Sequence, residues 1–173
     1  MNICQIIKDD IANGMGIRLS LFVSGCTRKC RGCFNREAWD FSYGQKLDEA
    51  MLEEILAELK KPQYDGLTIL GGEPFELSNQ YGVEGLVRAV RERLPDRTIW
   101  AYTGCTYEDD LTPGGRRHTY DTDYIMDNID VLVDGPYIER LRDLSLPFRG
   151  SSNQRIIDMR ATREQGTTRL LQI

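Results

Sequence analysis

Three cysteines within eight residues are the part of this sequence best suited to chemistry. Cys26, Cys30 and Cys33 have the spacing Cys-x3-Cys-x2-Cys. Thiolates are soft ligands that suit iron–sulfur clusters, zinc or copper(I). The spacing therefore predicts a metal site in this segment.

The number of cysteines favours one kind of metal site. Clusters that only transfer electrons normally take four cysteines, so three would leave one iron of a [4Fe–4S] cluster without a protein ligand. Catalytic metal sites keep such a position open for a substrate. The amino and carboxylate groups of S-adenosylmethionine could fill it, so that one electron breaks the sulfur–C5′ bond and forms a 5′-deoxyadenosyl radical.

A structural zinc site is the alternative for the same cysteines. Cys105, Cys4 or His118 would have to complete it. Structural zinc ligands usually come as two pairs, and the sequence has no second pair. A non-catalytic iron–sulfur or zinc protein, serving in electron transfer or structure, stays open as the rival from a different class.

Composition restricts the class of protein. The chain has 173 residues, of which 40% are hydrophobic, and this predicts a single domain over residues 1–173. The odd number of cysteines, five, excludes a complete intramolecular disulfide framework. No segment has the length and hydrophobicity of a membrane span or a secretory signal, so we expect a cytoplasmic protein without a membrane partner. The net charge of -5 argues against nucleic-acid binding.

The elements that must position the cysteines alternate between strands and helices. A β-prone run at 18–24 leads directly into the cysteine segment. Further strands are expected at 66–70, 98–103, 131–134 and 154–159, and helices at 48–61, 78–94 and 120–128. This order indicates an α/β fold of parallel βα units, and a closed eight-stranded barrel takes about 250 residues. We therefore expect an incomplete TIM-like barrel with parallel strands.

Polar and glycine residues follow these strands, where ligands collect in parallel sheets. Gly71, Gly72 and Glu73 come after the second strand. The glycines allow close backbone approach to a ligand, and the carboxylate could accept hydrogen bonds from an ammonium group, although an ordinary glycine turn would look the same. Asp134 ends the fourth strand and could equally orient a ligand or cap a helix.

The segment Cys26-Thr-Arg-Lys-Cys30-Arg-Gly-Cys33-Phe-Asn resembles the radical S-adenosylmethionine enzymes. Its ending is similar to that of the anaerobic ribonucleotide reductase activating proteins. The resemblance continues at 13–18, 71–74, 100–104, 133–137 and 148–155, and the last segment is the most discriminating. Two positions depart from the wider pattern, since Gly32 stands where many radical enzymes have an aromatic residue and Cys105 where we expect tyrosine.

This resemblance implies an enzyme that generates a glycyl radical on the large subunit of an anaerobic ribonucleoside-triphosphate reductase. It implies a [4Fe–4S] cluster on the three cysteines and S-adenosylmethionine as the second cofactor. The residues expected to bind S-adenosylmethionine are Gly71, Gly72, Glu73, Asn35, Thr103 and Asp134. A pyruvate formate-lyase activase or a radical enzyme acting on a small molecule is the alternative within the superfamily.

Two basic regions are candidates for partner contacts. The segment from residue 137 to the end carries seven Arg against two Asp and two Glu, and Arg149 and Arg155 in it are expected to form a docking surface or a ligand cover. Basic side chains also flank the cysteines and could attract a flavodoxin or ferredoxin-type electron donor. These side chains are Arg28, Lys29, Arg31 and Arg36.

Overall fold

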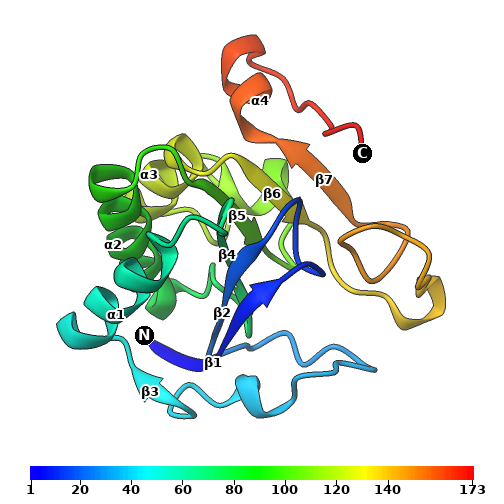
Figure 1. The fold of residues 1–173 in the computed structure, drawn as a ribbon. Coiled ribbons are helices and arrows are strands. Elements are labelled where there is room, and N and C mark those ends of the chain that lie inside the picture. The colour runs from blue at the N-terminus through cyan, green and yellow to red at the C-terminus, as the bar shows by residue number, and fades with distance from the viewer.

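The computed structural model describes all residues from Met1 to Ile173 and contains one seven-stranded sheet (Figure 1). The strand order is β3-β1-β2-β4-β5-β6-β7. The strands are β1 Asn2–Asp10, β2 Arg18–Val23, β3 Gln45–Lys46, β4 Gly66–Gly71, β5 Thr98–Tyr102, β6 Val131–Asp134 and β7 Arg155–Asp158. The helices are α1 Glu49–Leu59, α2 Leu77–Arg93, α3 Tyr120–Asn128 and α4 Met159–Gln165, with short helical turns η1 Glu37–Trp39, η2 Tyr107–Leu111 and η3 Glu139–Leu141.

The four central strands are parallel and follow one another in sequence order. β2, β4, β5 and β6 are joined through α1, α2 and α3 in turn. Right-handed crossovers that all advance in one direction place their helices on one face of a sheet. Figure 1 shows these three helices together on one side, which leaves the opposite face without a helical layer at its centre.

The three outer strands are antiparallel to their neighbours, so the expectation of parallel strands throughout is wrong for them. β1 pairs with β2 and β3, and β7 pairs with β6. Parallel neighbours need a long crossover, usually through a helix, whereas β1 and β2 are joined by residues 11–17 alone. Residues 135–154 between β6 and β7 contain only η3. The result is an open, mostly parallel sheet whose edge strands, β3 and β7, do not meet.

Alternate side chains of the parallel strands build the main core against the helices. Leu19, Leu21 and Val23 of β2 are fully buried on that face. Leu56 of α1 and Val87 of α2 belong to the same cluster. A smaller cluster lies on the opposite face, where the ring of Phe148 meets Trp100 at a centroid distance of 5.5 Å. Burial on both faces explains why these strands read as continuous hydrophobic runs.

The predicted helices begin and end close to the expected residues, and α1 and α3 begin at residues whose side chains cap them. Asp48 accepts a hydrogen bond from the Met51 amide at 2.9 Å and starts α1. Thr119 and Thr122 form a capping box at the start of α3. No helix of the structure is long and apolar enough to span a bilayer.

Candidate iron–sulfur cluster site

The carboxyl ends of the parallel strands bring the predicted site residues to one edge of the sheet. Val23 of β2 is in register with Gly71 of β4, and Tyr102 of β5 with Val133 of β6. The chain continues from these positions into the cysteine loop, residues 24–35, and into the other predicted segments. The sequence-based placement of the cysteines after a strand is confirmed.

Gly71 and Gly72 let the end of β4 lie directly on the chain that enters the cysteine loop. Gly71 has φ +113°, and an added Cβ would lie 2.6 Å from the Val23 nitrogen. The Gly72 amide donates to the Val23 carbonyl at 2.7 Å, and a Cβ there would lie 2.6 Å from the Gly25 oxygen. Gly71 and Gly72 thus lie close to the backbone of residues 23–25, directly before Cys26. Contact of the two glycines with S-adenosylmethionine stays a prediction.

The Glu73 carboxylate ties the end of β4 to the end of β5. It is 1% exposed and accepts from the Thr103 hydroxyl at 2.7 Å, the Gly104 amide at 2.8 Å and the Phe75 amide at 3.1 Å. Burial raises the pKa of Glu73, although these hydrogen bonds oppose the rise. Glu73 and Thr103 therefore hold the strand ends together, and their contact with S-adenosylmethionine stays a prediction.

The Asp134 side chain is fully buried and accepts hydrogen bonds from other groups of the protein. It accepts from Arg155 Nε at 2.9 Å and from the Tyr107 amide at 2.8 Å, which places it at the start of η2. The cap residue of η2 is Thr106, so Asp134 bonds the first amide of this helical turn from the neighbouring strand β6, and its contact with S-adenosylmethionine stays a prediction. Arg155 also holds Glu108 at 3.0 and 2.6 Å, and hydrogen bonds from Arg155 lower the pKa of Glu108 to about 2. Arg155 is thus paired with two carboxylates of the protein, and a docking role for Arg149 and Arg155 stays a prediction.

All five cysteines are free thiols, and the three of the motif differ in exposure. Cys26 is 7% exposed, whereas Cys30 and Cys33 are partly exposed and are joined by a turn in which the Cys33 amide donates to the Cys30 carbonyl at 3.2 Å. Burial raises the pKa of the Cys26 thiol, and the amides of Arg28 and Lys29 oppose the rise.

The loop reverses direction at Gly32, the position where many radical enzymes have an aromatic residue. Gly32 has φ +75°, and an added Cβ would lie 2.9 Å from the Glu139 carboxylate. Glu139 also pairs with Arg31 at 2.9 Å. Figure 1 shows the cysteine loop and the segment around η3 on the same side of the molecule. Glycine at this position therefore lets the loop bend against η3.

Two of the groups that could have completed a zinc site, Cys105 and His118, have other surroundings. Cys105 is buried in the main core, and burial raises its pKa to about 11. His118 pairs with Asp123 at 2.7 Å. No three Cys, His, Asp or Glu side chains are arranged so that they could hold a metal ion, and this includes the three motif thiols. The donor set, three soft thiols in one loop without a second pair, fits a cluster better than structural zinc.

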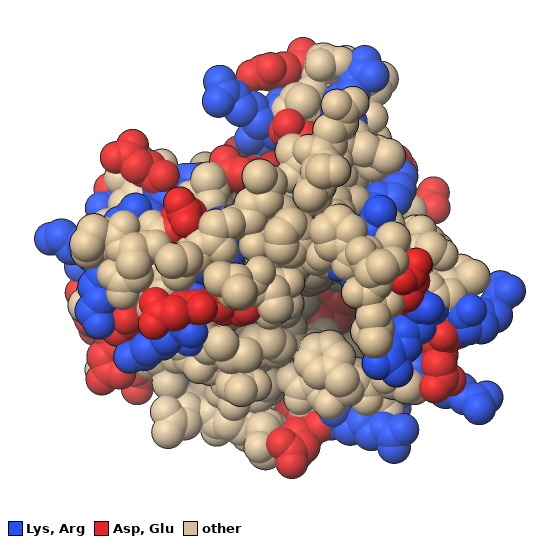
Figure 2. Space-filling view, turned by 45° about the vertical axis from the view of Figure 1, so that its right-hand side comes forward, with Lys and Arg blue, Asp and Glu red and all other residues tan.

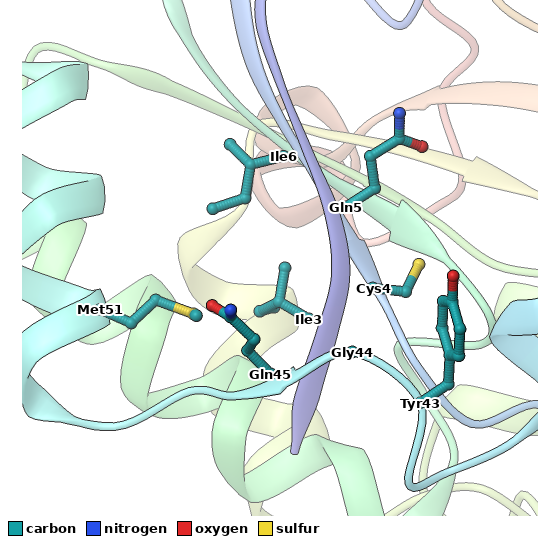
Figure 3. A pocket seen from close by; sticks show the side chains of 8 residues that line it. All are labelled: Ile3, Cys4, Gln5, Ile6, Tyr43, Gly44, Gln45 and Met51. Atoms are coloured by element: carbon teal, nitrogen blue, oxygen red, sulfur yellow. The ribbon is translucent and has the colours of Figure 1, made fainter.

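Cys4 approaches the cysteine loop from β1 through Asn35. The Asn35 amide donates to the Cys4 sulfur at 3.6 Å, and contact of Asn35 with S-adenosylmethionine stays a prediction. Cys4 and Tyr43 lie side by side at the wall of a hollow of about 420 Å³ along β1 and β3 (Figure 3). None of the predicted site residues lines this hollow, so it is not the cluster site.

Some of the basic side chains around the cysteines contact other residues of the protein. Arg28 lies across Gly104, whose added Cβ would fall 2.4 Å from Arg28 Nε, and Arg36 lies 5.8 Å from the ring centroid of Trp39. Phe34 beside Cys33 is 85% exposed. Figure 2, turned to show the face away from α1–α3, has a hollow near its centre with acidic atoms inside and basic side chains at its right-hand margin.

Three residues at the site were missed by the sequence reasoning. Thr27, Glu76 and Arg117 form one hydrogen-bonded group beside Cys26. They come from three loops far apart in the chain and share no motif spacing, so only the fold brings them together.

Comparison with known proteins decides the family. The family described as "4Fe-4S single cluster domain" matches residues 12–157, which include all three motif cysteines. The anaerobic ribonucleoside-triphosphate reductase-activating protein of Pasteurella multocida is 40% identical over 156 residues, 89% of this chain and 95% of the relative. The chain belongs to the family of anaerobic ribonucleoside-triphosphate reductase-activating proteins. Other members are the proteins of Escherichia coli K12, 36% identical over 92% of this chain and all of the relative, and of phage T4, 36% identical over 90% and 93%. No solved structure matches the chain.

Proposed function

We propose that this protein is a radical S-adenosylmethionine enzyme that activates an anaerobic ribonucleoside-triphosphate reductase by forming a glycyl radical on its large subunit. The observation that carries the proposal is the set of free thiols Cys26, Cys30 and Cys33 at the end of a parallel strand, within a matched 4Fe-4S domain. When bound, the reduced [4Fe–4S] cluster supplies the electron that splits S-adenosylmethionine into methionine and a 5′-deoxyadenosyl radical, which takes hydrogen from a glycine Cα.

The residues of this chain divide into two roles in the proposal. The thiolates of Cys26, Cys30 and Cys33 would each bind one iron of the cluster. Glu73, Thr103 and Asp134 hold the strand ends through their hydrogen bonds within the protein. Together with Gly71, Gly72 and Asn35, they are the residues that we propose to surround S-adenosylmethionine.

The open sheet suits a macromolecular substrate. We propose that the sheet works as the partial barrel of a single domain over residues 1–173, with the face away from α1–α3 open to the reductase. Support comes from the one-sided helical layer and from the hollow in Figure 2. A glycine loop of a large partner could enter an open side, whereas an enzyme for small molecules more often encloses its substrate.

We propose further that the protein works in the cytoplasm and takes its electron from a flavodoxin or ferredoxin-type donor. Five free cysteines agree with a reducing compartment. Lys29 and Arg36 leave positive charge beside the cysteine loop, which would attract an acidic donor. Cluster reduction by such a donor should slow as salt is added, and a rate independent of salt would contradict this part of the proposal.

Release of 5′-deoxyadenosine tests the enzyme activity directly. Anaerobically reconstituted protein, given dithionite and S-adenosylmethionine, should release 5′-deoxyadenosine and methionine, as measured by liquid chromatography. Cys30→Ser should abolish the release because it removes a cluster ligand, whereas Cys4→Ser should keep it. Bound zinc without any release would support the structural alternative and overturn the proposal.

A further inference from the structure

A buried ion pair at the start of α2 holds the first turn of the cysteine loop. Glu76 Oε1 accepts from the Thr27 amide at 2.7 Å and from the Thr27 hydroxyl at 2.6 Å. The Arg117 guanidinium bonds both oxygens of Glu76 and also donates from Nη2 to the Thr27 hydroxyl at 2.9 Å. The three residues thus form a closed triangle of hydrogen bonds, which we call the Thr27 clasp.

The clasp is built into the framework of the protein. The Glu76 side chain is 4% exposed and that of Arg117 18%. Burial alone would raise the pKa of Glu76, but hydrogen bonds from Thr27 and Arg117 outweigh it, and its pKa lies below the ordinary value. The Arg117 backbone is fixed as well, because its carbonyl accepts from Gln80 at 2.6 Å and its amide donates to the Asp110 carbonyl at 3.0 Å.

The Glu76 side chain does not cap α2, although Glu76 is the N-cap residue of that helix. At this position a side chain commonly accepts from the first free amides of the helix. No such bond is present, and the carboxylate reaches the cysteine loop instead. The buried Glu76 carboxylate binds Thr27, the residue after Cys26, instead of capping α2. This arrangement suggests that Glu76 stabilises the cysteine loop.

Contacts along the loop are uneven. The segment before Cys26 is fixed, since the Gly25 amide donates to the Ala38 carbonyl at 2.8 Å and its own carbonyl accepts from the Glu73 amide at 2.9 Å. The clasp fixes the residue after it. Around Cys30 and Cys33, the links are one turn, the Asn35–Cys4 contact at 3.6 Å and the Arg31–Glu139 pair, whose side chains are 93% and 47% exposed. Cys26 is therefore the one motif cysteine whose two chain neighbours are both hydrogen-bonded to other segments of the protein.

We infer that Glu76 and Arg117 are positioning residues that hold Cys26 ready to bind the cluster and keep it bound. This rests on the proposed function, in which Cys26 is a cluster ligand. A substitution that breaks the clasp removes hydrogen bonds among Thr27, Glu76 and Arg117, and the chain directly after Cys26 is then held less firmly. The thiol should then move more freely in the apoprotein, and the cluster should leave the loaded protein more readily.

The test uses Arg117→Met and Thr27→Val, with Arg116→Met as the matched control. Arg116 is in the same loop and pairs with Asp110 at 2.6 Å, away from Thr27. Thr27→Val keeps the size of the side chain and replaces its hydroxyl with a methyl group, which leaves the bond from the Thr27 amide to Glu76 in place. The first readout is the alkylation rate of Cys26 in the apoprotein, mapped by mass spectrometry and referred to that of buried Cys105. The second is the rate at which a chelator removes iron from the reconstituted protein.

Arg117→Met should raise both rates about tenfold, Thr27→Val less, and Arg116→Met less than twofold. Arg117→Lys should fall between wild type and Arg117→Met, because one ammonium group restores part of the clasp. Rates within twofold of wild type in both clasp variants, or equal effects of Arg116→Met and Arg117→Met, would overturn the inference. If Arg117→Met does not fold, Thr27→Val decides alone. Because the apoprotein readout needs no catalysis, it stays informative even if the proposed function fails.

Discussion

At the scale of single residues, the buried carboxylates near the strand ends accept hydrogen bonds from groups of the protein itself. Glu73, Glu76 and Asp134 are each buried with hydrogen-bond partners inside the protein. Sequence reasoning found Glu73 and Asp134 because they stand directly after strands. It could not find their partners, since the pairing of Asp134 with Arg155 depends on β7 lying antiparallel beside β6.

The Glu108–Arg155 pair should make stability depend on pH. The pKa of Glu108 falls from 4.5 to about 2 in the folded protein, so the stabilisation is complete above about pH 4.5 and is lost as pH falls toward 2. Because the Glu108 side chain is 43% exposed, solvent screening limits the effect to about 1 kcal/mol. Glu108→Gln should lower the free energy of unfolding at pH 7 by up to this amount, with the difference shrinking at pH 3, as measured by urea unfolding.

Glu164→Gln serves as the control for this measurement. Glu164 pairs with Arg160 on α4 at 3.2 Å, and the exposed fractions of the Arg160 and Glu164 side chains are 79% and 63%. Its removal should change stability little at either pH. A Glu108→Gln difference that stays constant from pH 7 to pH 3 would contradict the assignment.

At the scale of elements, Gly71 and Gly72 at the end of β4 set how closely the ends of β2 and β4 can approach. Gly71 has a left-handed backbone conformation and lies against the backbone of β2. A side chain at this position would therefore strain the turn and clash with backbone atoms that cannot move aside. The sequence predicted the turn from the glycine pair. It could not show that the approach is made to Val23 and Gly25, because that depends on the register of β2 and β4.

Gly71→Ala and Gly85→Ala should change stability in opposite directions. Alanine at 71 adds left-handed strain and a backbone clash, together about 2–4 kcal/mol of destabilisation. Gly85 lies within α2 with nothing within 4 Å of its added Cβ, so alanine there should stabilise by about 0.5–1 kcal/mol. Urea unfolding of the two apoproteins measures both. Equal stability of Gly71→Ala and wild type would show that the backbones of β2 and β4 do not meet closely at this point.

Most elements could be predicted because their signals are local. The expected helices at 48–61, 78–94 and 120–128 correspond to α1, α2 and α3. β1 was missed because its hydrophobic alternation is broken, with Ile3 as its only buried apolar residue and irregular pairing with β2. β7 was found as a strand, but four residues carry no information about direction.

At the scale of the whole molecule, α1, α2 and α3 cover one face of an open sheet, and the cysteine loop lies at the carboxyl edge of its parallel strands. The family could be predicted from the sequence because the cysteine motif and several strand-end segments are continuous in the chain. The clasp and the antiparallel edge strands could not, because they depend on contacts between distant segments.

Glycyl radical formation on the reductase tests the central claim most directly. The reconstituted protein is incubated anaerobically with the large subunit of the anaerobic reductase, S-adenosylmethionine and a reductant, and electron paramagnetic resonance is recorded. A glycyl radical signal on the reductase is predicted, present with Cys4→Ser and lost with Cys30→Ser. Cleavage of S-adenosylmethionine by the wild-type protein without any radical on the reductase would contradict the claim.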